Sequence, residues 1–157
     1  MTTRTAQRLA IAAAALLAAL WSGAPALGDA HEAGEPPASG RTPAPPGAAV
    51  YFITPADGAV VTSPLTVRFG LRGMGVAPAA VDQPNTGHHH LVIDAPLPDM
   101  RVPIPANDQY RHFGGGQTEM QIELPPGDHT LQLVLGDYRH VPFDPPIVSE
   151  RITITVE

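Results

Sequence analysis

The sequence contains no cysteine and no lysine among its 157 residues. Without cysteine the chain forms no disulfide, and blue-copper centres, cysteine-type zinc sites and thiol nucleophiles are excluded. All nine basic residues are arginines, and 15 acidic residues give the chain a formal net charge of −6. An acidic chain without a basic run does not fit binding to nucleic acid or to an anionic membrane surface.

The first segment has the pattern of a secretory signal peptide. Arg4 and Arg8 give it a positive start, residues 9–20 are apolar, and Ala26-Leu27-Gly28 supplies small residues where a signal peptidase reads. A retained membrane anchor is the less favoured alternative, because the apolar run is shorter than the about 20 residues of a membrane span. We therefore predict a signal peptide over residues 1–28, a periplasmic or secreted location, and no membrane insertion after cleavage.

The rest of the chain changes character once, near residue 49. Residues 29–48 are rich in proline, glycine and alanine and lack periodicity, which predicts a disordered linker. Beyond it, short runs alternate between apolar and polar residues and are separated by proline and glycine turns. These runs predict strands at 50–54, 64–71, 88–94, 118–124, 129–136 and 147–156. Since no later segment has helical periodicity, we predict an all-β domain over 49–157, an antiparallel immunoglobulin-like β-sandwich of about seven strands; a small barrel is the alternative.

Three consecutive histidines, His88-His89-His90, begin the predicted strand 88–94. In an immunoglobulin-type sandwich this strand runs antiparallel to 129–136, so its start lies beside Asp137 and His140. His112 precedes the strand 118–124 and reaches the same end. Histidine is the commonest side-chain metal ligand, so this convergence predicts a copper or zinc site. The candidate ligands are His88, His90, His112 and His140, and the simpler alternative is a set of solvated loop histidines.

Strand parity divides the three consecutive histidines. His89 shares the parity of the most apolar positions of its strand and should point into the core, whereas His88 and His90 should face the other way. Asp137 also has inward parity, so a buried His89–Asp137 hydrogen bond could tie the two strands together. In the functional interpretation, Asp137 does not bind the metal itself but orients a histidine that does, through a hydrogen bond. His129 is expected at the opposite end of the sandwich.

A second metal site is predicted at the mature N-terminus. Cleavage after Gly28 would leave Asp29-Ala30-His31, in which the amine, two amides and the imidazole can surround Cu(II) or Ni(II) in a square plane. Cleavage after Ala30 would leave His31 terminal, again as a copper chelate, and cleavage after Ala26 would destroy the motif. A chance histidine in a linker is the simpler interpretation.

The segments that carry the histidines resemble a known family. Residues 85–94 (NTGHHHLVID), 112–119 (HFGGGQTE) and 126–133 (PGDHTLQL), with Gly136-Asp137 and His140, resemble domain of unknown function 4399, a family of secreted bacterial proteins. The resemblance covers roughly residues 50–157. It implies an exported bacterial domain and brings no established activity with it.

The sequence shows no convincing catalytic nucleophile, so we expect a binding protein rather than an enzyme. The Gly114-Gly115-Gly116 triplet lacks the lysine, helix and spacing of a phosphate loop, and a turn that passes close to the histidines explains it better. These features favour an exported, non-enzymatic protein whose histidine-rich end binds copper or zinc. The alternative is a structural cell-envelope module that binds a protein or a glycan, without a metal.

Overall fold

The computed structural model describes residues 40–157, which consist of strands, turns and loops. No helix in this part of the chain is long and apolar enough to cross a membrane. The strands of the described residues are β1 (Ala49–Thr54), β2 (Val60–Val61), β3 (Leu65–Arg72), β4 (Gly75–Val76), β5 (Thr86–Ile93), β6 (Tyr110–His112), β7 (Glu119–Ile122), β8 (Gly127–Gly136) and β9 (Ile152–Val156).

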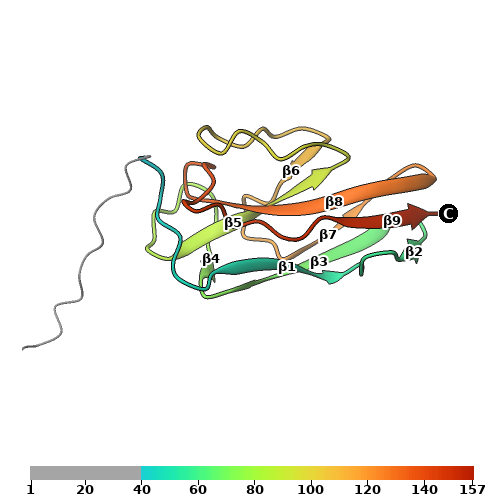
Figure 1. Ribbon diagram of the computed structural model, residues 1–157, viewed down its shortest axis with the longest axis horizontal. Coiled ribbons are helices and arrows are strands. Elements are labelled where there is room, and N and C mark those ends of the chain that lie inside the picture. Colours follow the sequence, from blue (N-terminus) through green and yellow to red (C-terminus); the bar gives the residue numbers. More distant parts are fainter. Residues whose placement is uncertain (1–39) are drawn as a thin grey trace, which may run out of the picture. The chain divides into compact units, whose positions relative to one another are not determined.

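The strands form two sheets that pack face to face (Figure 1). The smaller sheet has the order β1-β3-β7, and the larger has the order β2-β9-β8-β5-β4, with β6 also paired to β5. The long neighbours in both sheets are antiparallel, and only the two-residue strands β2 and β4 pair in parallel. This order is that of an immunoglobulin-type sandwich, so the predicted fold class is confirmed and the barrel alternative is wrong.

All six predicted strands are present, with shifted ends. The largest shift is in the last strand, predicted at 147–156 and observed only over Ile152–Val156. The prediction missed β2, β4 and β6, which are two or three residues long. Runs of this length carry no detectable alternation, and they are strands only because a longer neighbour pairs with them.

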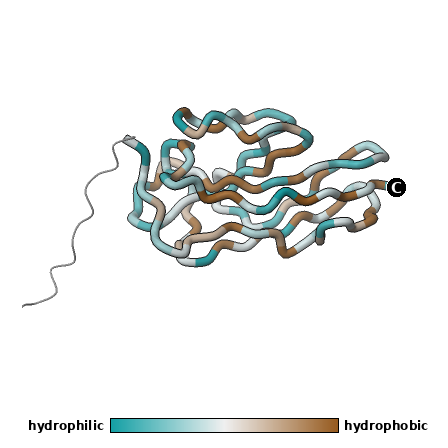
Figure 2. The backbone as a smooth tube through the Cα atoms, viewed as in Figure 1, coloured by the Kyte–Doolittle hydropathy of each residue, from teal (hydrophilic) through white to brown (hydrophobic). Residues whose placement is uncertain are grey.

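The main core lies between the two sheets, where apolar residues from alternate strand positions meet. Figure 2 shows hydrophobic and hydrophilic stretches alternating along several strands. Val67, Leu91, Leu131, Leu133 and Ile154 have no exposed surface. Burying each such side chain stabilises the fold by roughly 1.5–3 kcal/mol, which is how a chain without disulfides holds together.

A second, smaller core covers the outer face of the larger sheet. Val92 of β5 and Val134 of β8 pack there against Ala95 and Ile104 of the loop that leads from β5 to β6. Figure 1 shows this loop and β6 lying over β5 on the side away from the smaller sheet. As a result β5 is buried on both faces along almost its whole length.

The end of the predicted linker is attached to the domain. Thr42 and Ala44 exchange main-chain hydrogen bonds with Asp144, of 2.9 and 2.8 Å, and Ala44 and Ala48 pack against the main core. The predicted linker is therefore too long at its C-terminal end, because the small side chains here pack on apolar surface and the main chain finds hydrogen-bond partners. The predicted signal peptide and the rest of the linker lie outside the described residues.

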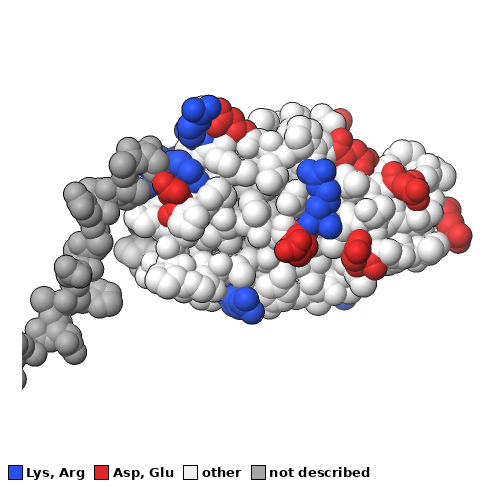
Figure 3. Space-filling model, viewed as in Figure 1, with Lys and Arg blue, Asp and Glu red and all other residues white. Residues whose placement is uncertain are grey.

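The charges on the face shown in Figure 3 are dispersed. On the face shown in Figure 3, arginines and acidic residues are interspersed, and several acidic side chains lie at the end that carries the C-terminus. Several of the charges form exposed pairs, such as Arg68 with Glu119 at 2.7 Å. This face therefore has no basic patch of the kind that binds nucleic acid.

Candidate metal centre

The side chains of the three consecutive histidines alternate across β5. His89 points into the main core, where its ring centroid lies 4.6 Å from that of Phe69. His88 and His90 project from the other face, as parity predicts, and their ring centroids are 4.8 Å apart. Solvent does not reach them, however, because all three histidines are completely buried. The interpretation of His88 and His90 as solvated residues is wrong, since the covered outer face of the larger sheet continues over them.

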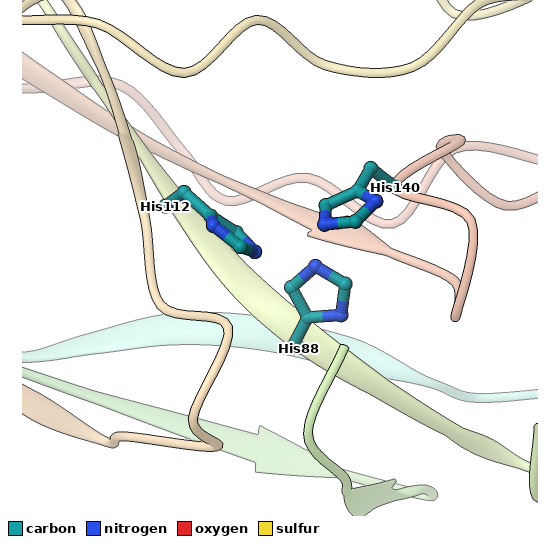
Figure 4. A group of neighbouring side chains, drawn as sticks. All are labelled: His88, His112 and His140. Carbon is teal, nitrogen blue, oxygen red and sulfur yellow. The ribbon is translucent and has the colours of Figure 1, made fainter. Parts of the chain in front are cut away.

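Two further histidines join His88 and His90 from separate segments. His112 belongs to β6 and pairs directly with His90 of β5. His140 lies in the turn that follows β8, and its ring centroid is 5.0 Å from that of His88. Figure 4 shows the rings of His88, His112 and His140 turned toward one another. One nitrogen from each of these three rings lies within 4.8 Å of the corresponding nitrogens of the other two.

The four rings are arranged approximately as a tetrahedron. Five of the six distances between ring centroids are 4.7–5.1 Å, and the sixth, between His90 and His140, is 6.1 Å. Four imidazoles bound to one tetrahedral ion, with metal–nitrogen distances of 2.0–2.1 Å, would place their centroids about 5.2 Å apart. The ring spacing is thus that of a four-histidine metal site, with His90 and His140 slightly too far from each other. The nitrogens that lie within 4.8 Å of one another belong to His88, His112 and His140, so His90 would have to turn toward them to act as the fourth ligand.

Two glycines make room for these rings. A Cβ atom on Gly136 would lie 2.8 Å from Cε1 of His90, and one on Gly114 would lie 2.3 Å from Cε1 of His112. Any side chain at either position would displace an imidazole, so the rings lie directly against the main chain. Gly114 belongs to the glycine triplet, which passes close to the histidines, as predicted from the sequence.

The environment keeps the buried imidazoles neutral. Burial lowers the pKa of His88 to about 4 and that of His90 to about 2, and neighbouring histidines contribute to both shifts. His112 is more exposed, but partial burial still lowers its pKa, and electrostatic repulsion from His140 lowers it a little further. None of the ring nitrogens of His88 and His90 has a hydrogen-bond partner among the described residues. Buried polar atoms usually have a partner, so these lone pairs are available to a ligand that accepts them, such as a metal ion.

His89 does not belong to this cluster. Burial lowers its pKa to about 4, and the nearby backbone of Gln117 offsets part of that shift without a hydrogen bond of normal geometry. The predicted His89–Asp137 pair is absent. The β5–β8 register places His89 opposite Leu135, two residues before Asp137, and the Asp137 carboxylate instead accepts hydrogen bonds from Thr42 and from the turn that carries His140. Sequence reasoning missed Thr42, because no pattern marks a threonine in a proline-rich segment as a partner for a distant aspartate.

The remaining predicted sites lie elsewhere. His129 is at the opposite end, as expected, where its Nδ1 is 2.6 Å from Oδ2 of Asp94 and its Nε2 is 2.8 Å from the carbonyl oxygen of Pro125. His31 and the proposed N-terminal chelate lie outside the described residues.

Comparison with known proteins identifies a family and no function. A family model described as Domain of unknown function (DUF4399) matches residues 67–157. No curated protein matches the chain. Among solved structures, an endo-beta-1,4-mannanase from Thermotoga petrophila aligns with 18% identity and a TM-score of 0.40, over 70% of this chain and 20% of that one. Fibronectin(III)-like modules of CbhA from Clostridium thermocellum align with 11% identity and a TM-score of 0.30, over 68% of this chain and 92% of theirs. This chain therefore spans about a fifth of the mannanase, and neither likeness is close enough to support an argument about function.

Proposed function

Because this chain belongs to the DUF4399 family, whose function is unknown, we propose a function from its own residues: it is an exported, non-enzymatic protein that binds a divalent transition metal, zinc or copper, at the four-histidine cluster. The observation that carries the proposal is the near-tetrahedral arrangement of four imidazole rings, two of them buried with unpartnered nitrogens. Export is supported only by the signal-peptide pattern of residues 1–28.

The ligand set favours zinc. Four neutral imidazoles in a tetrahedron suit Zn²⁺, whereas Cu²⁺ prefers a square-planar or tetragonal arrangement. The available nitrogens of His88, His112 and His140 lie up to 4.8 Å apart, and tetrahedral zinc requires about 3.4 Å between ligand atoms. Small rotations of the rings of His112, which is exposed, and His140, which is half-buried, would close this gap. Copper remains the competitor, because it binds nitrogen ligands more tightly when geometry permits.

With His90 as its fourth ligand the site is closed, which supports binding rather than catalysis. Catalytic zinc sites keep one position open for water, whereas structural and storage sites are filled by the protein. The metal would also stabilise the fold, since it binds only when β5, β6 and the turn after β8 are assembled. We therefore expect the metal to raise the unfolding temperature of the protein.

The test is metal content and calorimetric titration of the protein without its signal peptide, at pH 7.5. We expect one zinc ion per chain. His112→Ala and His140→Ala should each lower zinc affinity roughly a hundredfold, because losing a ligand should cost at least as much as losing a residue that hydrogen-bonds to a ligand. These two positions are chosen because their side chains reach the surface, so truncation leaves the core intact. His129→Gln is the matched control and should bind zinc as the wild type does. If the wild type binds neither zinc nor copper, the proposal is wrong, and the alternative of a structural cell-envelope module without a metal is favoured.

A further inference from the structure

His140 is held in an unusual backbone conformation by the turn around it. Its φ is +68°, a region that residues other than glycine adopt only when their surroundings require it. The His140 amide donates to the carbonyl oxygen of Asp137 at 2.8 Å, and the Asp137 amide donates to the carbonyl oxygen of Val141 at 2.9 Å. From the other side, the amide of Ile104 donates to the carbonyl oxygen of His140 at 2.9 Å. The turn thus determines where the His140 ring points.

The side chain of Asp137 forms the centre of this turn. Its Oδ1 atom accepts hydrogen bonds from the amides of Arg139 and Val141, at 2.8 and 2.9 Å, so both neighbours of His140 are bound to one carboxylate. Its Oδ2 atom accepts from the hydroxyl of Thr42 at 2.6 Å and from Nη2 of Arg139 at 3.2 Å. The side chain is only 1% exposed, so water does not replace a lost partner easily.

Thr42 reaches Asp137 from a segment that precedes the first strand. Residues 41–44, which we call the strap, run beside 142–144 and are joined to them by main-chain hydrogen bonds. Nε of Arg41 donates to the carbonyl oxygen of Pro142 at 3.0 Å, which anchors the start of the strap. The strap lies outside the part of the chain that matches the family model. It therefore adds a feature to the histidine end that the family pattern alone would not reveal.

We infer that Asp137 and Thr42 are positioning residues for the metal ligand His140, and that the strap thereby controls metal affinity. The inference rests on the proposed metal function. When the Thr42 hydroxyl is present, Asp137 is fixed and orients the two amides that flank His140. When it is lost, Oδ2 keeps only the longer hydrogen bonds from Arg139, of 3.2 and 3.4 Å. The carboxylate is then held less firmly, and the turn and the ring of His140 lose part of their orientation toward the other three histidines.

The test is a double-mutant cycle in the protein without its signal peptide, with zinc affinity measured by competition against a chelator. Thr42→Val removes the hydroxyl and keeps the shape, and we expect zinc affinity to fall about tenfold, the lower end of the effect of outer-shell partners. Thr42→Ser restores the hydroxyl and should retain wild-type affinity. Thr66→Val, at an exposed position whose side chain has no hydrogen bond in the described structure, is the matched control. Chemical denaturation of each metal-free variant reports whether a loss of affinity merely reflects a loss of stability.

The cycle distinguishes the possible failures. If Thr42 acts through His140, then Thr42→Val in the background of His140→Ala causes no further loss of zinc affinity. An equal tenfold loss in that background, or a Thr42→Val affinity equal to that of Thr66→Val, overturns the inference while leaving metal binding intact. A wild-type protein that binds no zinc overturns the proposed function itself. Asp137→Asn is the second variant; it should lower affinity at least as much as Thr42→Val, and wild-type affinity in that variant also refutes the positioning role.

Discussion

The metal-free protein should lose stability steeply as the pH falls from 7 to 5, because three buried histidines remain neutral in the folded state. Burial lowers the pKa of His88 and His89 to about 4 and that of His90 to about 2, whereas the unfolded chain has the ordinary value near 6.5. At pH 5 the unfolded state therefore binds three protons that the folded state does not, so acid favours unfolding. Each histidine contributes about 1.9 kcal/mol over this range, and together they contribute about 5.6 kcal/mol.

Other titrating groups change this result little. His112 acts in the same direction, since burial lowers its pKa as well. His129 acts in the opposite direction and offsets a small part of the loss, because its hydrogen bond to Asp94 raises its pKa. Asp94 and Asp137 have lowered pKa values, despite the opposing effect of burial, because hydrogen bonds from His129 and Thr42 respectively favour the carboxylate. Their contribution is lost only near and below pH 4. Local opening of the turn around His140 would let some rings protonate without global unfolding and would reduce this loss. The contribution of His89 alone, about 1.9 kcal/mol, is still a large share of the 5–15 kcal/mol free energy of unfolding of a typical domain.

The assay is urea denaturation at pH 7, 6 and 5 after dialysis against a chelator. His89→Leu separates the contributions, because His89 lies in the apolar core against Phe69 and is not a proposed ligand. This variant should lose about 2 kcal/mol less than the wild type between pH 7 and pH 5. Equal pH dependence in the two proteins would refute the claim that burial keeps His89 neutral.

Three further predictions concern the surroundings of the site. Gly136→Ala should displace His90 and reduce zinc affinity about tenfold, at the low end of the cost of overpacking. Gly70→Ala is the control: its Cβ meets only the outer atoms of the exposed Tyr51 ring, so zinc affinity measured by calorimetry should stay at the wild-type value. His129 has acceptors at both ring nitrogens, and the hydrogen bond that its Nδ1 donates to the Asp94 carboxylate raises its pKa. Protonated His129 therefore stabilises the fold fully below pH 6.5, and this stabilisation is lost as the pH rises through its raised pKa. In thermal unfolding, His129→Gln should lower the free energy of unfolding by about 1–2 kcal/mol at pH 6 and by less at pH 9. Mass spectrometry of the exported protein should find that it starts at Asp29 or His31, and a start at Leu27 would exclude the N-terminal chelate. His31→Ala should weaken Cu(II) binding and leave zinc binding unchanged.

The sandwich was predictable because alternation and turn residues are local signals. Strands β3, β8 and β9 each carry several alternating apolar residues, and antiparallel pairing then brings His88, His112 and His140 to one end. The order of pairing follows from the immunoglobulin topology, so the convergence of three distant segments could be derived without coordinates.

The burial of the histidines and the role of Thr42 could not be predicted in this way. Strand parity predicts the face of the sheet on which His88 and His90 lie. Whether solvent reaches that face depends on where the loop that contains Ile104 packs. The loop has no periodicity, and its position is set by packing on Val92 and Val134. The Thr42–Asp137 hydrogen bond spans 95 residues and joins a proline-rich segment to a turn, a contact that no local pattern specifies.

The central claim is that one metal ion is held by His88, His90, His112 and His140. X-ray absorption at the zinc edge, on protein loaded with one equivalent of zinc, tests it most directly. We predict four nitrogen neighbours at 2.0–2.1 Å with the outer-shell scattering of four imidazoles, and three imidazoles in His112→Ala. A spectrum with one or two imidazoles and mainly oxygen neighbours would contradict the account.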